Sequence, residues 1–203
     1  GDSRLMRHNQ HNPGFVFQKE PIEFNKWSKK EILQYCLGGT LYMPGTYNVV
    51  DKIFSKSISG LTSMVMCLED AIRPEEVEEA EANILQHLDS LSLVSESQKI
   101  TEDQIPLIFI RVRNPDQFAA FASRLTDEQA KALTGFVFPK FRSNNAGTYL
   151  AELQALNRRL GVTLFGMPIL EGKEIAYRET RSQELASLKE ILGPYRELVL
   201  NIR

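Results

Sequence analysis

Charged side chains stand directly behind several short apolar runs of this chain. Glu69 and Asp70 follow the second run, Arg111 lies at the end of the third, Lys140 follows the fourth and Glu171 follows the fifth. Carboxylates are the ligands that Mg²⁺ prefers, while arginine and lysine bind the carboxylate or phosphate of a substrate. This mixture of residue types suits a metal-assisted reaction of an anionic substrate.

Each of these residues also has a structural interpretation. Glu69 and Asp70 could start an acidic helix, where carboxylates favour the positive end of the helix dipole. Arg111 could form a structural ion pair, and Lys140 could be a solvated loop residue. Glu171 ends an apolar run, where a carboxylate needs a partner. Their recurrence at successive runs indicates a common site more strongly than any one of them does.

Apolar runs and amphipathic stretches alternate along the chain from about residue 39. Each run is apolar at nearly every position, which is typical of a strand buried on both faces. The stretches between them carry apolar residues at three- and four-residue steps, which predicts helices packed on a sheet. The expected strands are 40–43, 63–68, 107–112, 136–138, 164–170 and 198–202, and the expected helices are 49–57, 74–91, 117–125, 127–133, 147–160 and 181–192.

This alternation predicts an α/β protein with a parallel sheet covered by helices. Both an open doubly wound sheet and a closed eight-stranded barrel use this unit, and both place their chemistry at the carboxyl ends of the strands. Residues 39–203 supply five to six units at about 30 residues each. A complete barrel takes about 250 residues. The count therefore predicts either an open sheet or a barrel without its last two units.

The composition excludes several classes of protein. Across 203 residues, 24 Lys and Arg oppose 26 Asp and Glu, so we expect no general electrostatic hold on nucleic acid or on a membrane surface. No apolar run approaches the roughly 20 residues that span a bilayer. The 2 cysteines build no disulfide framework, which favours a reduced, cytoplasmic protein. Residues 1–38 form an arm with a short helix, and 39–203 form the sheet domain.

Several motifs in the second part of the chain resemble one family. In order and spacing they match the citrate lyase beta-subunit-like family of the HpcH/HpaI aldolase superfamily. The resemblance is strongest to its C–C-bond-lyase branch, which is associated with tellurite and stress-resistance genes. The matching segments are Thr40-Leu41-Tyr42-Met43-Pro44-Gly45, Cys67-Leu68-Glu69-Asp70-Ala71, Ile110-Arg111-Val112, Phe138-Pro139-Lys140 and Ile169-Leu170-Glu171.

The resemblance implies a (β/α)8 TIM barrel, of which this chain supplies about six βα units, in a homo-oligomer. It implies a carbon–carbon lyase or aldolase that acts on a 2-oxo acid or an acyl-CoA thioester through a metal-stabilised enolate. Mg²⁺, with Mn²⁺ as the alternative, would be held by Glu171. The resemblance also implies that Glu69 and Asp70 orient metal-bound water or the arginine. Arg111 would bind the oxo acid or stabilise the enolate charge. The substrate would also be bound by Lys140, Pro44 and Gly45.

The chain departs from the family in one respect. The family's second metal ligand is an Asp in a Gly-x-x-Asp loop after the strand expected at 198–202, and that position lies beyond residue 203. We therefore expect a fragment that is inactive by itself and, because its sheet has open edges, poorly soluble or oligomeric. Two other functions stay open: a catalytically silent relative that binds an anionic ligand or partner enzyme, and phosphoenolpyruvate-type chemistry on the same barrel.

Overall fold

The computed structural model of the chain describes residues 40–44, 63–69, 72–96 and 106–200. The expected arm at 1–38 and the expected helix at 49–57 lie outside these residues. Gly45 and Asp70 of the expected site also lie outside them, as does the chain end at Arg203. Of the expected site residues, Pro44, Glu69, Arg111, Lys140 and Glu171 can therefore be placed.

Five parallel strands form one sheet, and their order in space is their order along the chain. In a doubly wound sheet the order in which strands are added reverses at a switch point, whereas in a barrel each new strand is added beside the previous one. The fold is therefore part of a (β/α) barrel. The strands are β1 (Thr40–Pro44), β2 (Ser63–Cys67), β3 (Leu107–Arg111), β4 (Gly135–Phe138) and β5 (Phe165–Pro168).

The sixth strand, expected at 198–202, is only begun in the described residues. A 3-10 helix, η3 (Gly193–Leu198), occupies the first expected position and was not predicted. Val199 then makes an isolated parallel bridge to Gly166 of β5, and the Leu200 N–H donates to the Gly166 carbonyl at 2.8 Å. The chain therefore reaches the place of the next barrel strand one residue later than expected.

The helices follow the predicted alternation, with local capping at their ends. Asn114 accepts from the Gln117 N–H, Thr126 forms a capping box with Gln129, and left-handed Gly161 ends the helix Ala146–Leu160. The helices are η1 (Pro74–Glu76), α4 (Val77–Glu96), α5 (Pro115–Arg124), α6 (Asp127–Ala130), α7 (Ala146–Leu160), α8 (Lys173–Ala176) and α9 (Arg178–Leu192). None of them is long and apolar enough to cross a membrane.

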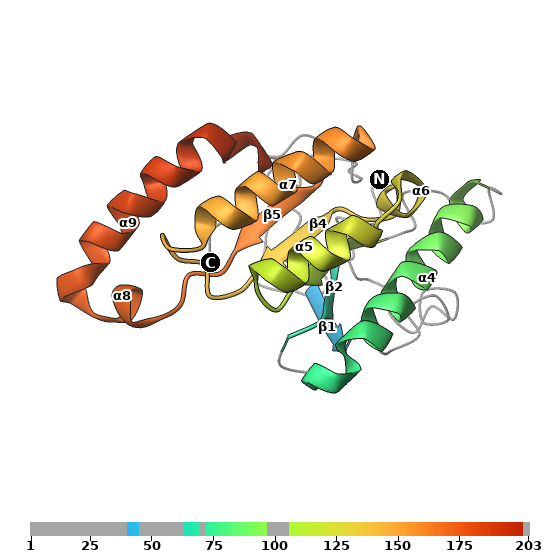
Figure 1. The fold of residues 1–203 in the computed structure, drawn as a ribbon, viewed down its shortest axis with the longest axis horizontal. Helices are drawn as coiled ribbons and strands as arrows, with labels where there is room; N and C mark the ends of the chain where they lie inside the picture. Colours follow the sequence, from blue (N-terminus) through green and yellow to red (C-terminus); the bar gives the residue numbers. More distant parts are fainter. Residues whose placement is uncertain (1–39, 45–62, 70–71, 97–105, 201–203) are drawn as a thin grey trace, which may run out of the picture.

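Figure 1 shows α4, α5 and α7 over one face of the strands, with α9 beyond α7. Strands β2 to β5 are buried on both faces because their side chains alternate between two apolar clusters. The outer cluster packs against the helices and holds stacked and tilted aromatic rings, such as Phe118 against Phe136 at 4.7 Å. The inner cluster contains Val65, Leu107, Phe109, Val137, Phe165, Met167 and Leu200.

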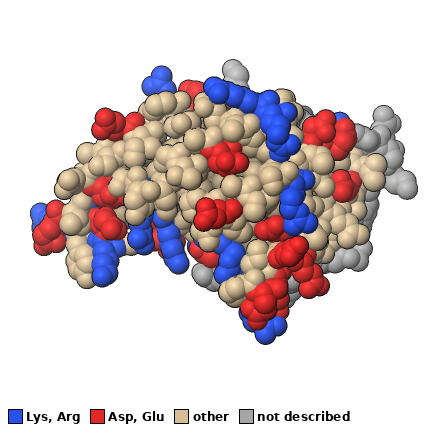
Figure 2. All heavy atoms as spheres, viewed as in Figure 1, with Lys and Arg blue, Asp and Glu red and all other residues tan. Residues whose placement is uncertain are grey.

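The surface carries charges of both signs, mixed over the face seen in Figure 2. Acidic side chains gather where η1 passes into α4, at Glu75, Glu76, Glu78 and Glu79. This is the positive end of the helix dipole, so the carboxylates there need no further explanation.

Candidate active site

The alternation of side chains along the strands decides which polar residues face the barrel interior. Arg111 is two residues beyond Phe109, an inner-cluster residue, and therefore faces the same side of the sheet. Glu69 follows the end of β2 by two residues and Glu171 follows the end of β5 by three. Both lie beyond their strands, and their contacts with Arg111 place them beside this interior-facing residue.

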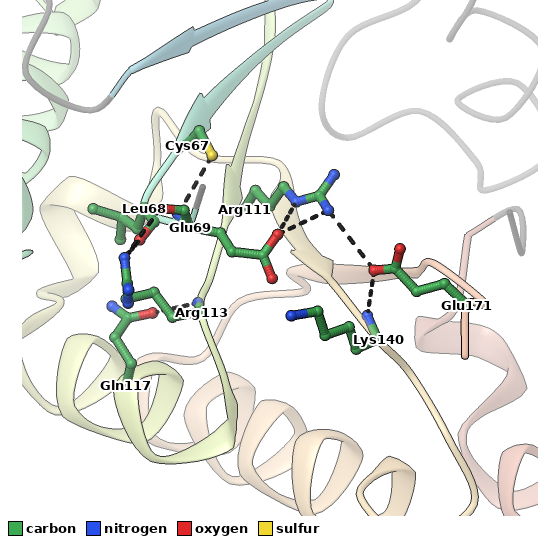
Figure 3. A network of polar contacts seen from close by, with 8 residues as sticks. All are labelled: Cys67, Leu68, Glu69, Arg111, Arg113, Gln117, Lys140 and Glu171. Carbon is green, nitrogen blue, oxygen red and sulfur yellow. Dashed lines mark hydrogen bonds and ion pairs between the residues drawn. The ribbon is translucent and has the colours of Figure 1, made fainter. Parts of the chain in front are cut away.

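Glu69 and Arg111 form a buried ion pair on adjacent strand ends. Glu69 Oε1 accepts from Arg111 Nε at 3.0 Å and lies 2.9 Å from Nη2, so the guanidinium holds this oxygen with two nitrogens. Only 7% of the Glu69 side chain and 20% of the Arg111 side chain are exposed. The Glu69 N–H points back to the Cys67 sulfur at 3.4 Å. This pair stands in the centre of Figure 3.

Glu171 approaches the same guanidinium from the other side. Its Oε1 lies 3.9 Å from Arg111 Nη2, and it accepts a hydrogen bond from the Lys140 backbone N–H at 2.9 Å. Lys140 has a φ of 50°, the only positive φ among the described residues other than glycine. In this left-handed conformation, just after β4, the Lys140 backbone N–H points to Glu171, while the lysine side chain is exposed (Figure 3).

Arg113 acts as a latch on the loop that carries Glu69. Its Nη1 donates to the carbonyl oxygens of Leu68, Glu69 and Ile72 at 2.9, 3.0 and 2.9 Å. Its own backbone N–H donates to Gln117 Oε1 at 2.9 Å, so α5 anchors the latch (Figure 3). A second strand-end arginine is therefore used to hold backbone rather than substrate.

The electrostatics keep Arg111 charged. Burial would lower the pKa of its guanidinium, but attraction and hydrogen bonding to Glu69, with a smaller contribution from Glu171, raise the pKa above its ordinary value. Burial also raises the pKa of the Tyr149 hydroxyl, and the negative charge of Glu69 adds to that shift. Tyr149 therefore stays neutral, while Arg111 stays positively charged.

The structure brings together most of the described residues that the sequence marked. Glu69, Arg111 and Glu171 form one charged row, and Lys140 joins it through its backbone N–H. Pro44, at the end of β1, pairs in register with Cys67, two residues before Glu69. Among the described residues, the Lys140 side chain makes no hydrogen bond or ion pair with the charged row. The roles of all these residues remain predictions.

Sequence reasoning missed Arg142. Its guanidinium lies against Gly172, the residue after Glu171: a Cβ on Gly172 would be 2.8 Å from Arg142 Nε. The Arg142 Nε is buried and has no hydrogen-bond partner among the described residues. The signal in the sequence is a second cation two residues beyond Lys140, in the same loop.

The donor set fits a magnesium ion that keeps most of its own waters. Mg²⁺ in enzymes is held by one or two carboxylates, with water and substrate completing the shell. Glu171 offers such a carboxylate, 42% exposed, whereas Glu69 is engaged by Arg111. In the described part of the chain, no group of three His, Cys, Asp or Glu side chains could hold a metal.

The model of the family described as C-C bond lyase of the TIM-barrel fold matches residues 31–203. The chain belongs to this family. The match covers every described strand and each charged residue of the row Glu69, Arg111 and Glu171. No curated protein matches the chain.

Solved structures support the barrel fold of this C-C bond lyase family member. The pyruvate/acetyl-CoA ternary complex of Haloferax volcanii malate synthase aligns with a TM-score of 0.58 at 16% identity, over 91% of this chain and 48% of that one. The magnesium/glyoxylate complex of the same enzyme aligns with a TM-score of 0.52 at 17% identity, over 81% and 48%. The chain thus spans about half the length of these structures.

Proposed function

We propose that the protein is a Mg²⁺-dependent carbon–carbon lyase or aldolase of the citrate lyase beta-like type. Its substrate would be a 2-oxo acid or an acyl-CoA thioester. The observation that carries this proposal is the position of the Arg111 guanidinium at the end of β3, 2.9 Å from Glu69 after β2 and 3.9 Å from Glu171 after β5. Barrel enzymes place their reacting groups at this end of the strands.

Arg111 would stabilise the charge that the reaction creates. When the carbon–carbon bond next to a carbonyl breaks, its electron pair moves into an enolate, and the enolate oxygen becomes negative. A fixed cation close to that oxygen lowers the barrier because it is already oriented when the charge forms. Glu69 holds the guanidinium by two nitrogens, and Arg113 holds the loop of Glu69, so the orientation of the cation is built into the fold.

Glu171 would hold the metal. When bound there, Mg²⁺ supplies Lewis-acid polarisation of the substrate's carboxylate and carbonyl oxygens. The Lys140 N–H fixes one oxygen of Glu171 and leaves the other oxygen available. Lys140 Nζ is exposed near the same edge and would bind the substrate's anionic end, as would the turn after Pro44.

The substrate class rests on similarity as well as on charge. The malate synthase structures that share the fold are complexes with magnesium and glyoxylate and with pyruvate and acetyl-CoA. Those ligands are a 2-oxo acid and an acyl-CoA thioester, which are the two classes that the sequence resemblance implies. We propose further that the whole protein is a cytoplasmic homo-oligomer.

A second candidate is a catalytically silent member that binds an anionic ligand or a partner enzyme in the same place. The specific observation in its favour is that the described residues gather no three metal-ligating side chains. In this case Arg111 and Lys140 would bind the anion, but no turnover would follow.

Substitution of Glu171 in the full-length protein separates the two candidates. We expect Glu171→Gln to weaken Mg²⁺ binding in calorimetry and to lower the rate of CoA release from acetyl-CoA with glyoxylate by about 100-fold. Glu190→Gln, at an exposed position of α9, is the matched control and should change neither. An unchanged rate in Glu171→Gln refutes the role of Glu171. Anion binding without turnover in the unmodified protein supports the silent alternative.

A further inference from the structure

Arg142 is a partly buried cation that nothing in the described structure neutralises. It lies in the loop between β4 and α7, and its Nε is shielded from solvent. No ion pair joins it to Glu171 or to Glu174 in the described residues, although both carboxylates flank the glycine that it covers. A buried guanidinium N–H without an acceptor is unfavourable, and such groups are normally paired. An anion bound beside Gly172 would supply the acceptor that this Nε lacks.

The fold makes specific room for this guanidinium. Gly172 has a φ of 123° and a ψ of 173°, a conformation that side chains rarely adopt. A Cβ there would also lie 2.8 Å from Nε, 2.9 Å from Nη2 and 3.0 Å from Cζ of Arg142. Glycine at 172 thus serves both the turn and the close approach of the cation.

The backbone that carries Arg142 is tied down on both sides. The Arg142 N–H donates to Asn145 Oδ1 at 2.9 Å, and its carbonyl accepts from the Ala146 N–H at 2.8 Å. The next residue, Ser143, donates through its N–H and its hydroxyl to the two oxygens of Glu184 on α9, at 2.6 and 2.8 Å. A cation on such a fixed base binds an anion with little ordering cost.

We propose that Arg142 is a second anion-binding residue of the candidate active site. It would bind an oxyanion group of the substrate, a carboxylate or a phosphate, on the β4–β5 side of the strand ends. This inference rests on the proposed function and sharpens it. With Arg111 binding the oxo acid, a substrate that contacts both guanidinium groups would carry a second anionic group for Arg142. A planar guanidinium forms two parallel hydrogen bonds with either oxyanion.

The test measures anion binding without metal, so that it is independent of the metal chemistry. Inorganic phosphate and succinate are titrated separately into the full-length protein by calorimetry, in EDTA at low salt. We expect at least one of them to bind. Binding of phosphate would indicate a substrate with a phosphorylated end, and binding of succinate would indicate one with a carboxylate end. Arg142→Gln should weaken this binding by about tenfold or more, the factor that a charge-assisted hydrogen bond contributes.

Two controls keep the result interpretable. Arg158→Gln removes an exposed arginine of α7 and should leave anion affinity unchanged. Glu171→Gln should weaken Mg²⁺ binding but not metal-free anion binding, so failure of the lyase proposal and failure of this one are distinguishable. Arg142→Lys keeps the charge and should bind with intermediate affinity.

Three results would overturn the inference. One is the absence of phosphate and succinate binding by the unmodified protein, and another is unchanged affinity in Arg142→Gln. The third is that Arg142→Gln and Arg142→Lys both fail to fold by circular dichroism, because Arg142 would then be a structural partner of the loop around Glu174.

Discussion

The ion pair between Glu69 and Arg111 is the most consequential contact of single residues in this structure. Both side chains are largely buried, and two nitrogens of the Arg111 guanidinium lie 2.9 and 3.0 Å from Glu69 Oε1. Burying two charges offsets much of their attraction, but removing one of them leaves the other without compensation. Because the pKa of Arg111 is raised, its positive charge persists well above neutral pH, and on the alkaline side the stability it contributes is lost only as the pH rises through that raised pKa.

Arg111→Met should therefore destabilise the protein by about 3 kcal/mol or more, since the Glu69 carboxylate stays buried without its cation. Urea unfolding measures the change. The double variant Arg111→Met with Glu69→Gln should regain part of this loss, because the stranded charge is removed as well. Lys131→Met breaks a pair whose side chains are half exposed and should cost less than about 1 kcal/mol. Equal effects of the two single variants would contradict the buried-pair interpretation.

At the scale of elements, the site depends on loops that are held from behind. The loop after β2 carries Glu69, and Arg113, at the start of the loop after β3, fastens it through three carbonyl groups. Gln117 of α5 then links Arg113 to α4, because its Nε2 donates to Glu81 Oε2 at 3.0 Å. The helices therefore position the charged row as well as cover the sheet.

Arg113→Met should loosen the loop after β2. We expect a loss of about 2–3 kcal/mol in the free energy of unfolding, because a charged donor to three carbonyls disappears. Hydrogen exchange should accelerate at the Leu68 and Ile72 amides, which donate to the Arg111 and Glu69 carbonyls. Arg159→Met is the matched control, since Arg159 Nη2 donates to two carbonyls at the end of α5. It should leave exchange at 68 and 72 unchanged, and equal exchange in both variants would refute the latch.

The register between β4 and β5 also depends on a single glycine. A Cβ on Gly135 would clash with the backbone carbonyl of Phe165, whereas a Cβ on Gly147 of α7 would meet nothing within 4 Å. Gly135→Ala should therefore unfold the protein or lower its melting temperature sharply. Gly147→Ala should stabilise it by up to about 1 kcal/mol through helix propensity. Thermal melts of both variants test this, and a tolerated alanine at 135 would show that the strands are further apart than described.

For the whole molecule, the important feature is a sheet that does not close within the described residues. β1 pairs with β2 on one side, and beyond β5 only the bridge from Gly166 to Val199 continues the sheet. Unpaired strand edges are places where another chain can add. This concerns the 203-residue chain alone and follows from its strand order.

We therefore expect the 203-residue chain to associate or to be poorly soluble in isolation. Light scattering coupled to size exclusion over a dilution series would show species larger than a monomer, or loss of protein to aggregates. The physical reason is that the edges left unpaired in the described part of the sheet carry backbone groups that gain hydrogen bonds on association. A monodisperse monomer at all concentrations would contradict this prediction.

The sequence by itself determined the order and type of the elements. Runs such as Ser63–Cys67 and Leu107–Arg111 are apolar on both faces, and only a parallel sheet covered by helices buries such strands. The same runs located Glu69, Arg111 and Glu171, because the ends of apolar strands can be read from the local sequence. Strand 198–202 was placed one residue early, because the apolar spacing does not reveal that η3 continues to Leu198.

Tertiary structure alone decided which charges meet and through which atoms. The sequential strand order, which separates a barrel from a doubly wound sheet, follows from packing between distant segments and leaves no local pattern. Likewise, Lys140 meets Glu171 through its amide rather than its side chain, and Arg113 holds backbone while Arg111 holds a carboxylate. These choices depend on distances between residues 30 or more positions apart, as from Lys140 to Glu171 (31 positions), so residue type and spacing along the chain could not fix them.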